Sequence, residues 1–205
     1  MKRLAVSTIP ILLFAISAMA QVMPSQFSAD MVTHTSHGDM KGKMFFGGTN
    51  IRIDMESPGG PVSNITDITA KKNYMVMHNS QMYMEHDLSK PGPMGRGPQM
   101  PQIRQFDPTN PCANRTDMTC KQVGSETVNG RSCDKWEFSK GSQLEETNWI
   151  DKKLHVPVKS VHADGTSWEL QNIKEGAQPD KLFEIPAGYQ KLDMGGMMRG
   201  MGRDQ

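Results

Sequence analysis

The chain lacks the short motifs that mark the commonest catalytic and nucleotide-binding sites. It contains no Gly-x-Ser-x-Gly, no His-Glu-x-x-His and no phosphate-binding glycine loop. Its acidic residues show no spacing that singles out a general acid and a general base. We therefore expect a protein that is not an enzyme and that carries no cofactor.

A strong charge of either sign is also missing. The full chain has 23 Lys and Arg against 22 Asp and Glu. Loss of a leader that contains Lys2 and Arg3 leaves the rest of the chain about neutral. Nucleic acid and anionic membrane surfaces recruit proteins through basic patches, so we expect neither as a main partner.

An apolar stretch long enough to cross a membrane is absent. The one apolar run, at residues 4–18, follows Lys2 and Arg3 and precedes Ala18-Met19-Ala20. This pattern is typical of a bacterial secretory signal peptide at residues 1–20, and the run is too short and wrongly flanked for a membrane span. We therefore expect a periplasmic or secreted protein with no transmembrane span after cleavage.

No segment has the apolar period of a good helix, whereas short strand-like segments recur. Residues 121–128 and 132–138 flank Asn129-Gly130, a dipeptide that tolerates the two positive φ values of a type I′ hairpin turn. Further short segments at 145–151, 157–162 and 167–173 are each bounded by turn residues. The sequence predicts a mainly β fold, a curved antiparallel sheet of about ten strands with one or two short helical turns.

The chain after the leader suits one domain with irregular additions. We expect a single β domain at residues 21–192, which contains a Pro/Gly-rich loop at 88–119. A single helical turn capped by Asp180 is expected near its end. Residues 193–205 alternate Met with Gly and predict a flexible tail.

Cysteine is scarce, with three residues at Cys112, Cys120 and Cys133. If Asn129-Gly130 forms the turn, Cys133 faces Glu126, and Cys120 lies roughly 20 Å further along the ladder at ~3.3 Å per residue. A disulfide requires Cα atoms within ~7 Å, so a Cys120–Cys133 bridge is disfavoured. We predict a Cys112–Cys120 disulfide and expect Cys133 to be a buried free thiol rather than a reactive or metal-binding one.

Methionine is abundant, with 18 residues in the chain. A two-residue turn at Asn79-Ser80 places Met77 opposite Met82 and Met75 opposite Met84, so the four side chains share one face of two strands. An earlier hairpin, which pairs Phe46 with Ile51, extends that surface if both hairpins face one cavity. The candidate ligand-binding residues are Met75, Met77, Met82, Met84, Met44, Ile53 and Met55.

Three interpretations of these methionines stay open. They can fill the protein's own core, or line a surface for an irregular apolar ligand such as an acyl chain, because Met is unbranched and adaptable. They can also bind Cu(I), a soft ion that favours thioethers, together with His78 or His86. Methionines sealed inside weaken both ligand hypotheses, an open groove favours a lipid, and sulfurs beside an imidazole favour copper.

The chain resembles exported bacterial proteins related to the outer-membrane lipoprotein carrier LolA. The resemblance rests on VGSETVNGRSC at residues 123–133 with KWE at 135–137, WID at 149–151, PVK at 157–159 and LFEIPAGY at 182–189. It covers most of residues 27–192 and is strongest to a bacterial family known only as a domain of unknown function.

This resemblance implies a sheet curved into an incomplete barrel, whose hydrophobic concave face holds lipid or lipoprotein acyl chains in characterised relatives. It carries over no catalytic residues. We therefore expect a non-enzymatic periplasmic protein that binds a lipid or lipoprotein acyl chain, with no resident metal. The alternatives are a periplasmic copper-handling protein and an envelope module that binds another protein.

Overall fold

The computed structural model describes residues 26–90, 111–112 and 117–192. These residues form twelve strands and one short 3-10 helix. In chain order they are β1 (Phe27–Thr35), β2 (Gly38–Phe46), β3 (Asn50–Ser57), β4 (Gly60–Asp67), β5 (Lys72–Met77), β6 (Met82–Asp87), β7 (Thr119–Val128), β8 (Arg131–Lys140), β9 (Gln143–Asp151), β10 (Pro157–His162), β11 (Ser167–Glu175), η1 (Asp180–Phe183) and β12 (Gln190–Lys191).

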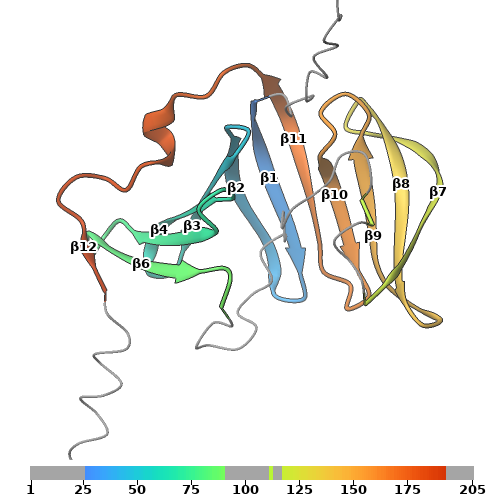
Figure 1. Cartoon of the computed structure of the whole chain (residues 1–205), viewed down its shortest axis with the longest axis horizontal. Coiled ribbons are helices and arrows are strands. Elements are labelled where there is room, and N and C mark those ends of the chain that lie inside the picture. The colour runs from blue at the N-terminus through green and yellow to red at the C-terminus, as the bar shows by residue number, and fades with distance from the viewer. Residues whose placement is uncertain (1–25, 91–110, 113–116, 193–205) are drawn as a thin grey trace, which may run out of the picture.

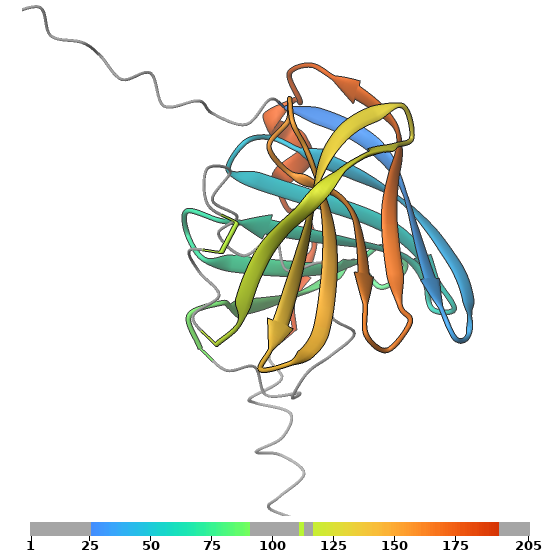
Figure 2. The same ribbon diagram turned by 90° about the vertical axis from the view of Figure 1, so that its right-hand side faces the viewer.

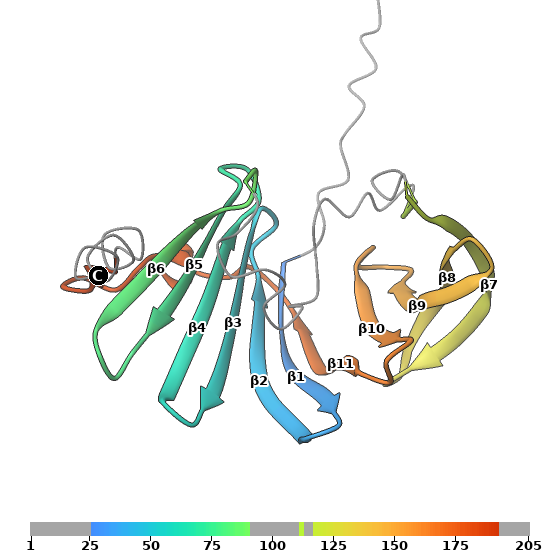
Figure 3. The same cartoon turned by 90° about the horizontal axis from the view of Figure 1, so that it is seen from below.

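All twelve strands belong to one sheet, in the order β12-β6-β5-β4-β3-β2-β1-β11-β10-β9-β8-β7 (Figure 1). The sheet does not close, because β12 and β7 lie at opposite ends of this order. It is strongly bent, and strands β7 to β10 curl round at one end of the molecule (Figure 3). The expected mainly β, curved and incomplete sheet is confirmed.

Two runs of hairpins make up this sheet. Strands β1 to β6 follow one another antiparallel, as do β7 to β11, because short turns connect successive strands. The two runs meet where β1 pairs with β11, the first and the last long strands (Figure 2). The central ladder of the sheet therefore joins residues from both ends of the described chain.

The hairpin turns follow the sequence signals. Asn129 and Gly130 have φ values of +48° and +79°, as a type I′ turn requires. The register then pairs Glu126 with Cys133, as predicted. The predicted disulfide is also confirmed, since Cys112 and Cys120 are bridged with their Cα atoms 5.8 Å apart.

The hydrophobic core lies where the two runs of strands meet. Its buried side chains come from the first three strands, from β7 to β11 and from the connection between β9 and β10. The buried core residues are Phe27, Ala29, Met31, Met44, Phe46, Ile51, Ile53, Val128, Cys133, Trp149, Leu154, Val156, Val158, Trp168 and Leu170. Strands β4 to β6 contribute no side chain to this core, although Ile65 and Val76 are buried as well.

Three details of the sequence prediction are wrong. The described residues form twelve strands rather than about ten, and β12 pairs with β6 in parallel, so the sheet is not wholly antiparallel. Asp180 does not cap the helical turn, because η1 begins at Asp180 itself and Pro179 occupies the cap position. The Asp180 carboxylate instead lies in the first turn, where the helix dipole favours negative charge.

Several sequence predictions fall outside the described residues. These are the signal peptide at 1–20, the tail at 193–205 and most of the loop at 88–119. Within the described part of the chain, no helix is long and apolar enough to cross a membrane.

Candidate functional site

One cross-strand row connects the hydrophobic core to the methionine hairpin. The register aligns Met44 of β2 with Ile53 of β3, then Asn64, Met75 and Met84 on the next three strands. Residues directly opposite in neighbouring strands project from the same face of the sheet. The predicted pairs Met44–Ile53 and Met75–Met84 are therefore parts of a single row.

Burial changes along this row. Met44 and Ile53 are 3% and 4% exposed and belong to the core, whereas Met75 is 37% exposed. Met84, at the end of the row, is partly exposed. The row therefore passes from the packed interior to a surface that solvent reaches.

A second row runs beside the first on the same face. It aligns Met55 with Val62, Met77 and Met82, all of which are partly exposed. Met55 packs against the core, whereas Met77 and Met82 form the last pair of the hairpin. We refer to Met75, Met77, Met82 and Met84 as the methionine patch. Its four side chains are grouped as the sequence predicted, and they are not sealed inside the protein.

The opposite face of the same strands carries a chain of hydrogen bonds. Asp54 Oδ1 accepts hydrogen bonds from Arg52 Nε at 2.7 Å and from the Ser63 hydroxyl at 2.6 Å. The Ser63 hydroxyl lies 2.7 Å from His78 Nε2, and His78 Nδ1 lies 3.0 Å from the Tyr189 hydroxyl. Both ring nitrogens of His78 are thus engaged, on the face away from the methionine patch.

This network fastens residues 180–192, the C-terminal segment, across β3 to β6 (Figure 1). Arg52 Nη1 donates to the Leu182 carbonyl at 2.9 Å, and β12 adds backbone hydrogen bonds along β6. Gly47 permits the close approach of Phe183, because a Cβ on residue 47 would lie 2.6 Å from the Phe183 ring. The polar network therefore positions the C-terminal segment rather than a nucleophile, since Ser63 is 1% exposed.

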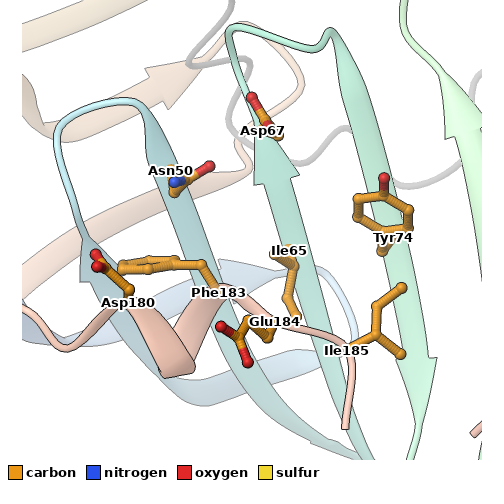
Figure 4. A pocket seen from close by; sticks show the side chains of 8 residues that line it. All are labelled: Asn50, Ile65, Asp67, Tyr74, Asp180, Phe183, Glu184 and Ile185. Atoms are coloured by element: carbon orange, nitrogen blue, oxygen red, sulfur yellow. The ribbon is translucent and has the colours of Figure 1, made fainter. Parts of the chain in front are cut away.

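An open pocket of about 420 Å³ lies between β3 to β5 and the C-terminal segment. Ile65, Phe183 and Ile185 form its apolar wall, and the Tyr74 ring stands at one side (Figure 4). The remaining lining residues are polar or acidic, namely Asn50, Asp67, Asp180 and Glu184. Asp67 is already engaged, because its Oδ1 accepts the Ala70 backbone N–H at 2.8 Å.

Cys133 is the free cysteine, and its thiol is fully buried. Burial, together with the smaller effect of the neighbouring Asp151 carboxylate, raises the pKa of Cys133 to about 11. The thiolate is the reactive form, so at neutral pH this thiol has neither the charge nor the exposure that reactivity requires.

We therefore expect iodoacetamide at pH 8 to leave Cys133 unmodified in the folded protein. Mass spectrometry should find less than a few per cent alkylation within an hour. In guanidinium chloride without reductant, one cysteine per chain should react, because Cys112 and Cys120 stay bridged. Rapid alkylation of the folded protein would contradict this assignment.

Among the described residues, no three His, Cys, Asp or Glu side chains are grouped closely enough to hold a metal ion. The two histidines named with the copper interpretation differ in position. His78 belongs to the polar network, whereas His86 pairs with Asn73 in the row next to Met75–Met84, on the face of the methionine patch.

The polar network and the pocket were not predicted from the sequence. Their members are far apart in the chain, since 130 residues separate Arg52 from Leu182 and 111 separate His78 from Tyr189. One signal was available. Asp54 precedes Met55 and His78 follows Met77, so strand alternation places both on the face opposite the methionines, where a polar residue needs a partner if that face is covered.

A family model described as "Domain of unknown function (DUF4412)" matches residues 28–156. No curated protein sequence matches the chain. Among solved structures, an uncharacterized conserved protein from Thermus thermophilus has a TM-score of 0.55 at 11% identity, over 83% of this chain and 91% of that one. The fold is therefore shared with at least one other protein that is described only as uncharacterized.

Two further solved structures are similar over most of this chain. MucB has a TM-score of 0.51 at 12% identity, over 80% of this chain and 58% of its own. The LolA superfamily protein NE2245 from Nitrosomonas europaea has a TM-score of 0.37 at 11% identity, over 80% of this chain and 91% of its own. At 12% identity the likeness to MucB reflects the fold alone and assigns no ligand.

Proposed function

We propose a non-catalytic role in binding an apolar ligand for this chain, which belongs to the family described as "Domain of unknown function (DUF4412)". The proposed ligand is a lipid or lipoprotein acyl chain, and the proposed site is the methionine patch. The observation that carries the proposal is the cross-strand row that begins at buried Met44, reaches exposed Met75 and ends at Met84. The face that carries core side chains thus continues, across the buried Asn64, onto a solvent-facing sheet surface.

The chemistry of the patch suits such a ligand. Unbranched, polarizable side chains adapt their shape to an irregular apolar partner. Burial of an acyl chain contributes ~0.8 kcal/mol per CH₂ group, so a few methylene groups lying on the patch stabilise a complex measurably. Met77 and Met82 in the second row widen the surface, because they lie beside Met75 and Met84 on the same face.

The proposed setting is the periplasm. The leader at residues 1–20 has the sequence features of a secretory signal. The Cys112–Cys120 disulfide supports the same location, because disulfides form and persist in oxidising compartments.

Fluorescence titration with cis-parinaric acid, a long-chain fatty acid probe, tests the proposal. The protein should bind the probe, and Met75→Glu/Met84→Glu should weaken binding at least tenfold, because a charge on the patch must be desolvated beneath the acyl chain. Met75→Leu/Met84→Leu should bind like the wild type, since leucine preserves the apolar surface.

Met40→Glu provides the matched control, because Met40 is 46% exposed on β2 and lies outside the patch. Circular dichroism establishes that each variant is folded. The proposal fails if the wild type does not bind the probe, or if the double glutamate variant binds it as well as Met40→Glu does.

A further inference from the structure

An imidazole lies on the same face as the methionine patch. Along β6, side chains alternate between faces, so Met82, Met84 and His86 project from one side. The register places Asn73–His86 in the row next to Met75–Met84. His86 is therefore a neighbour of Met84 along its own strand and lies diagonally across from Met75.

His86 differs from His78 in what it contacts. His78 is held between Ser63 and Tyr189 on the other face. Among the residues that the structure describes, none forms a hydrogen bond or an ion pair with the His86 ring, which is partly exposed. A ring nitrogen of His86 is therefore available for a ligand on the patch.

The carboxylates next to His86 point away from it. Glu85 and Asp87 flank it in the chain, so both project from the opposite face. Glu85 is paired there with Lys72 at 2.9 Å, and Asp87 accepts the Ser89 hydroxyl at 2.5 Å. The donors on the patch are thus uncharged thioethers and one imidazole, without a hard oxygen anion beside them.

We propose that Met75, Met84 and His86 form a binding site for Cu(I). Thioether sulfur is a soft donor that selects Cu(I), and imidazole also suits copper. Cβ atoms of directly opposite residues lie about 4.5–5.5 Å apart, and the three side-chain torsions of Met let two sulfurs converge on one ion. The site shares residues with the proposed acyl-chain surface, but it depends on sulfur atoms rather than on apolar area.

Anaerobic titration of the full protein with Cu(I), in competition with bicinchoninate and with ascorbate as reductant, tests this site. The wild type should withdraw one tightly held Cu(I) from the chelator. Met75→Leu/Met84→Leu should lower that affinity at least tenfold, and His86→Asn should lower it as well. Met40→Leu, which removes an exposed sulfur elsewhere on the sheet, should leave it unchanged.

The Met75→Leu/Met84→Leu variant separates this proposal from the proposed function, because it keeps the apolar surface and removes the sulfurs. Loss of Cu(I) with retained cis-parinaric acid binding supports the copper site whether or not the acyl chain is the ligand in the cell. The copper site is overturned if the wild type takes no Cu(I) from the chelator. It is also overturned if the leucine variant competes as strongly as the wild type, since the copper then binds other methionines.

Discussion

Replacing Asp151 with asparagine is expected to destabilise the fold by ~3–5 kcal/mol, the usual cost of removing one partner from a buried ion pair. The Asp151 side chain is 2% exposed. Its carboxylate accepts hydrogen bonds from the Arg131 guanidinium and from the backbone N–H groups of Lys153 and Leu154, at 2.8 and 2.7 Å. Asparagine leaves the Arg131 charge without its buried counter-ion.

The effect should depend on pH in a defined direction. Burial alone raises the pKa of Asp151, but the hydrogen bonds from Arg131, Leu154 and Lys153 outweigh it, and the net pKa is lowered. A carboxylate whose pKa is lowered in the folded state stabilises the protein at pH values above its pKa in the unfolded state, which is near 4. That contribution is lost as the pH falls through its pKa in the folded state. The difference in unfolding free energy between the wild type and Asp151→Asn should therefore be fully present at pH 7 and become smaller in strong acid.

Urea unfolding at pH 7 and at pH 3, with the disulfide intact, measures both effects. Asp134→Asn is the matched control, because Asp134 is 31% exposed and its partner Lys152, at 3.2 Å, is 45% exposed. An exposed pair of this kind contributes at most ~1 kcal/mol. Equal losses for the two variants at pH 7 would contradict the structural role assigned to Asp151.

Replacing Phe27 with alanine should cost ~3–5 kcal/mol of unfolding free energy, as large-to-small changes in packed cores do. Phe27 is fully buried, and its ring stacks on Phe46 with centroids 5.4 Å apart. Phe27 is also the first residue of β1 and pairs with both β2 and β11. The cavity would therefore open where the two runs of strands meet.

Phe45→Ala supplies the comparison, since Phe45 is next to Phe46 but lies on the other face of β2 and is only partly buried. Phe45→Ala should lower the free energy of unfolding clearly less than Phe27→Ala does. Thermal and urea unfolding of the two variants measure the difference. A Phe27 variant as stable as the Phe45 variant would show that the core is not organised around this stacked pair.

Local pattern predicted most of the sheet. The Asn129-Gly130 turn and the short loop at residues 47–50 fix their hairpin registers, because a turn of known length aligns its two strands residue by residue. The same argument gave the Met75–Met84 pair and hence the grouping of the methionine patch. The register of the Asn129-Gly130 hairpin also excluded a Cys120–Cys133 bridge and so favoured the Cys112–Cys120 disulfide.

Contacts between distant segments could not be predicted in this way. The pairing of β12 with β6 and the binding of the Leu182 carbonyl by Arg52 depend on how the C-terminal segment crosses the sheet, which no local pattern encodes. The burial of Met44 and Ile53 could not be predicted from the local sequence pattern either. Alternation shows which side chains share a face, but the curl of β7 to β10 decides which part of that face becomes core.

The pairing of β1 with β11 sets the order in which the chain can fold. Phe27 lies opposite Glu175, so the middle of the sheet is incomplete until nearly all of the described chain is present. Such distant contacts carry a large loop-closure cost, which slows folding. A nascent chain that stops before β11 leaves one side of β1 unpaired, as an edge open to aggregation. The central ladder between the first and the last long strand can therefore form only after residue 175 has been synthesised.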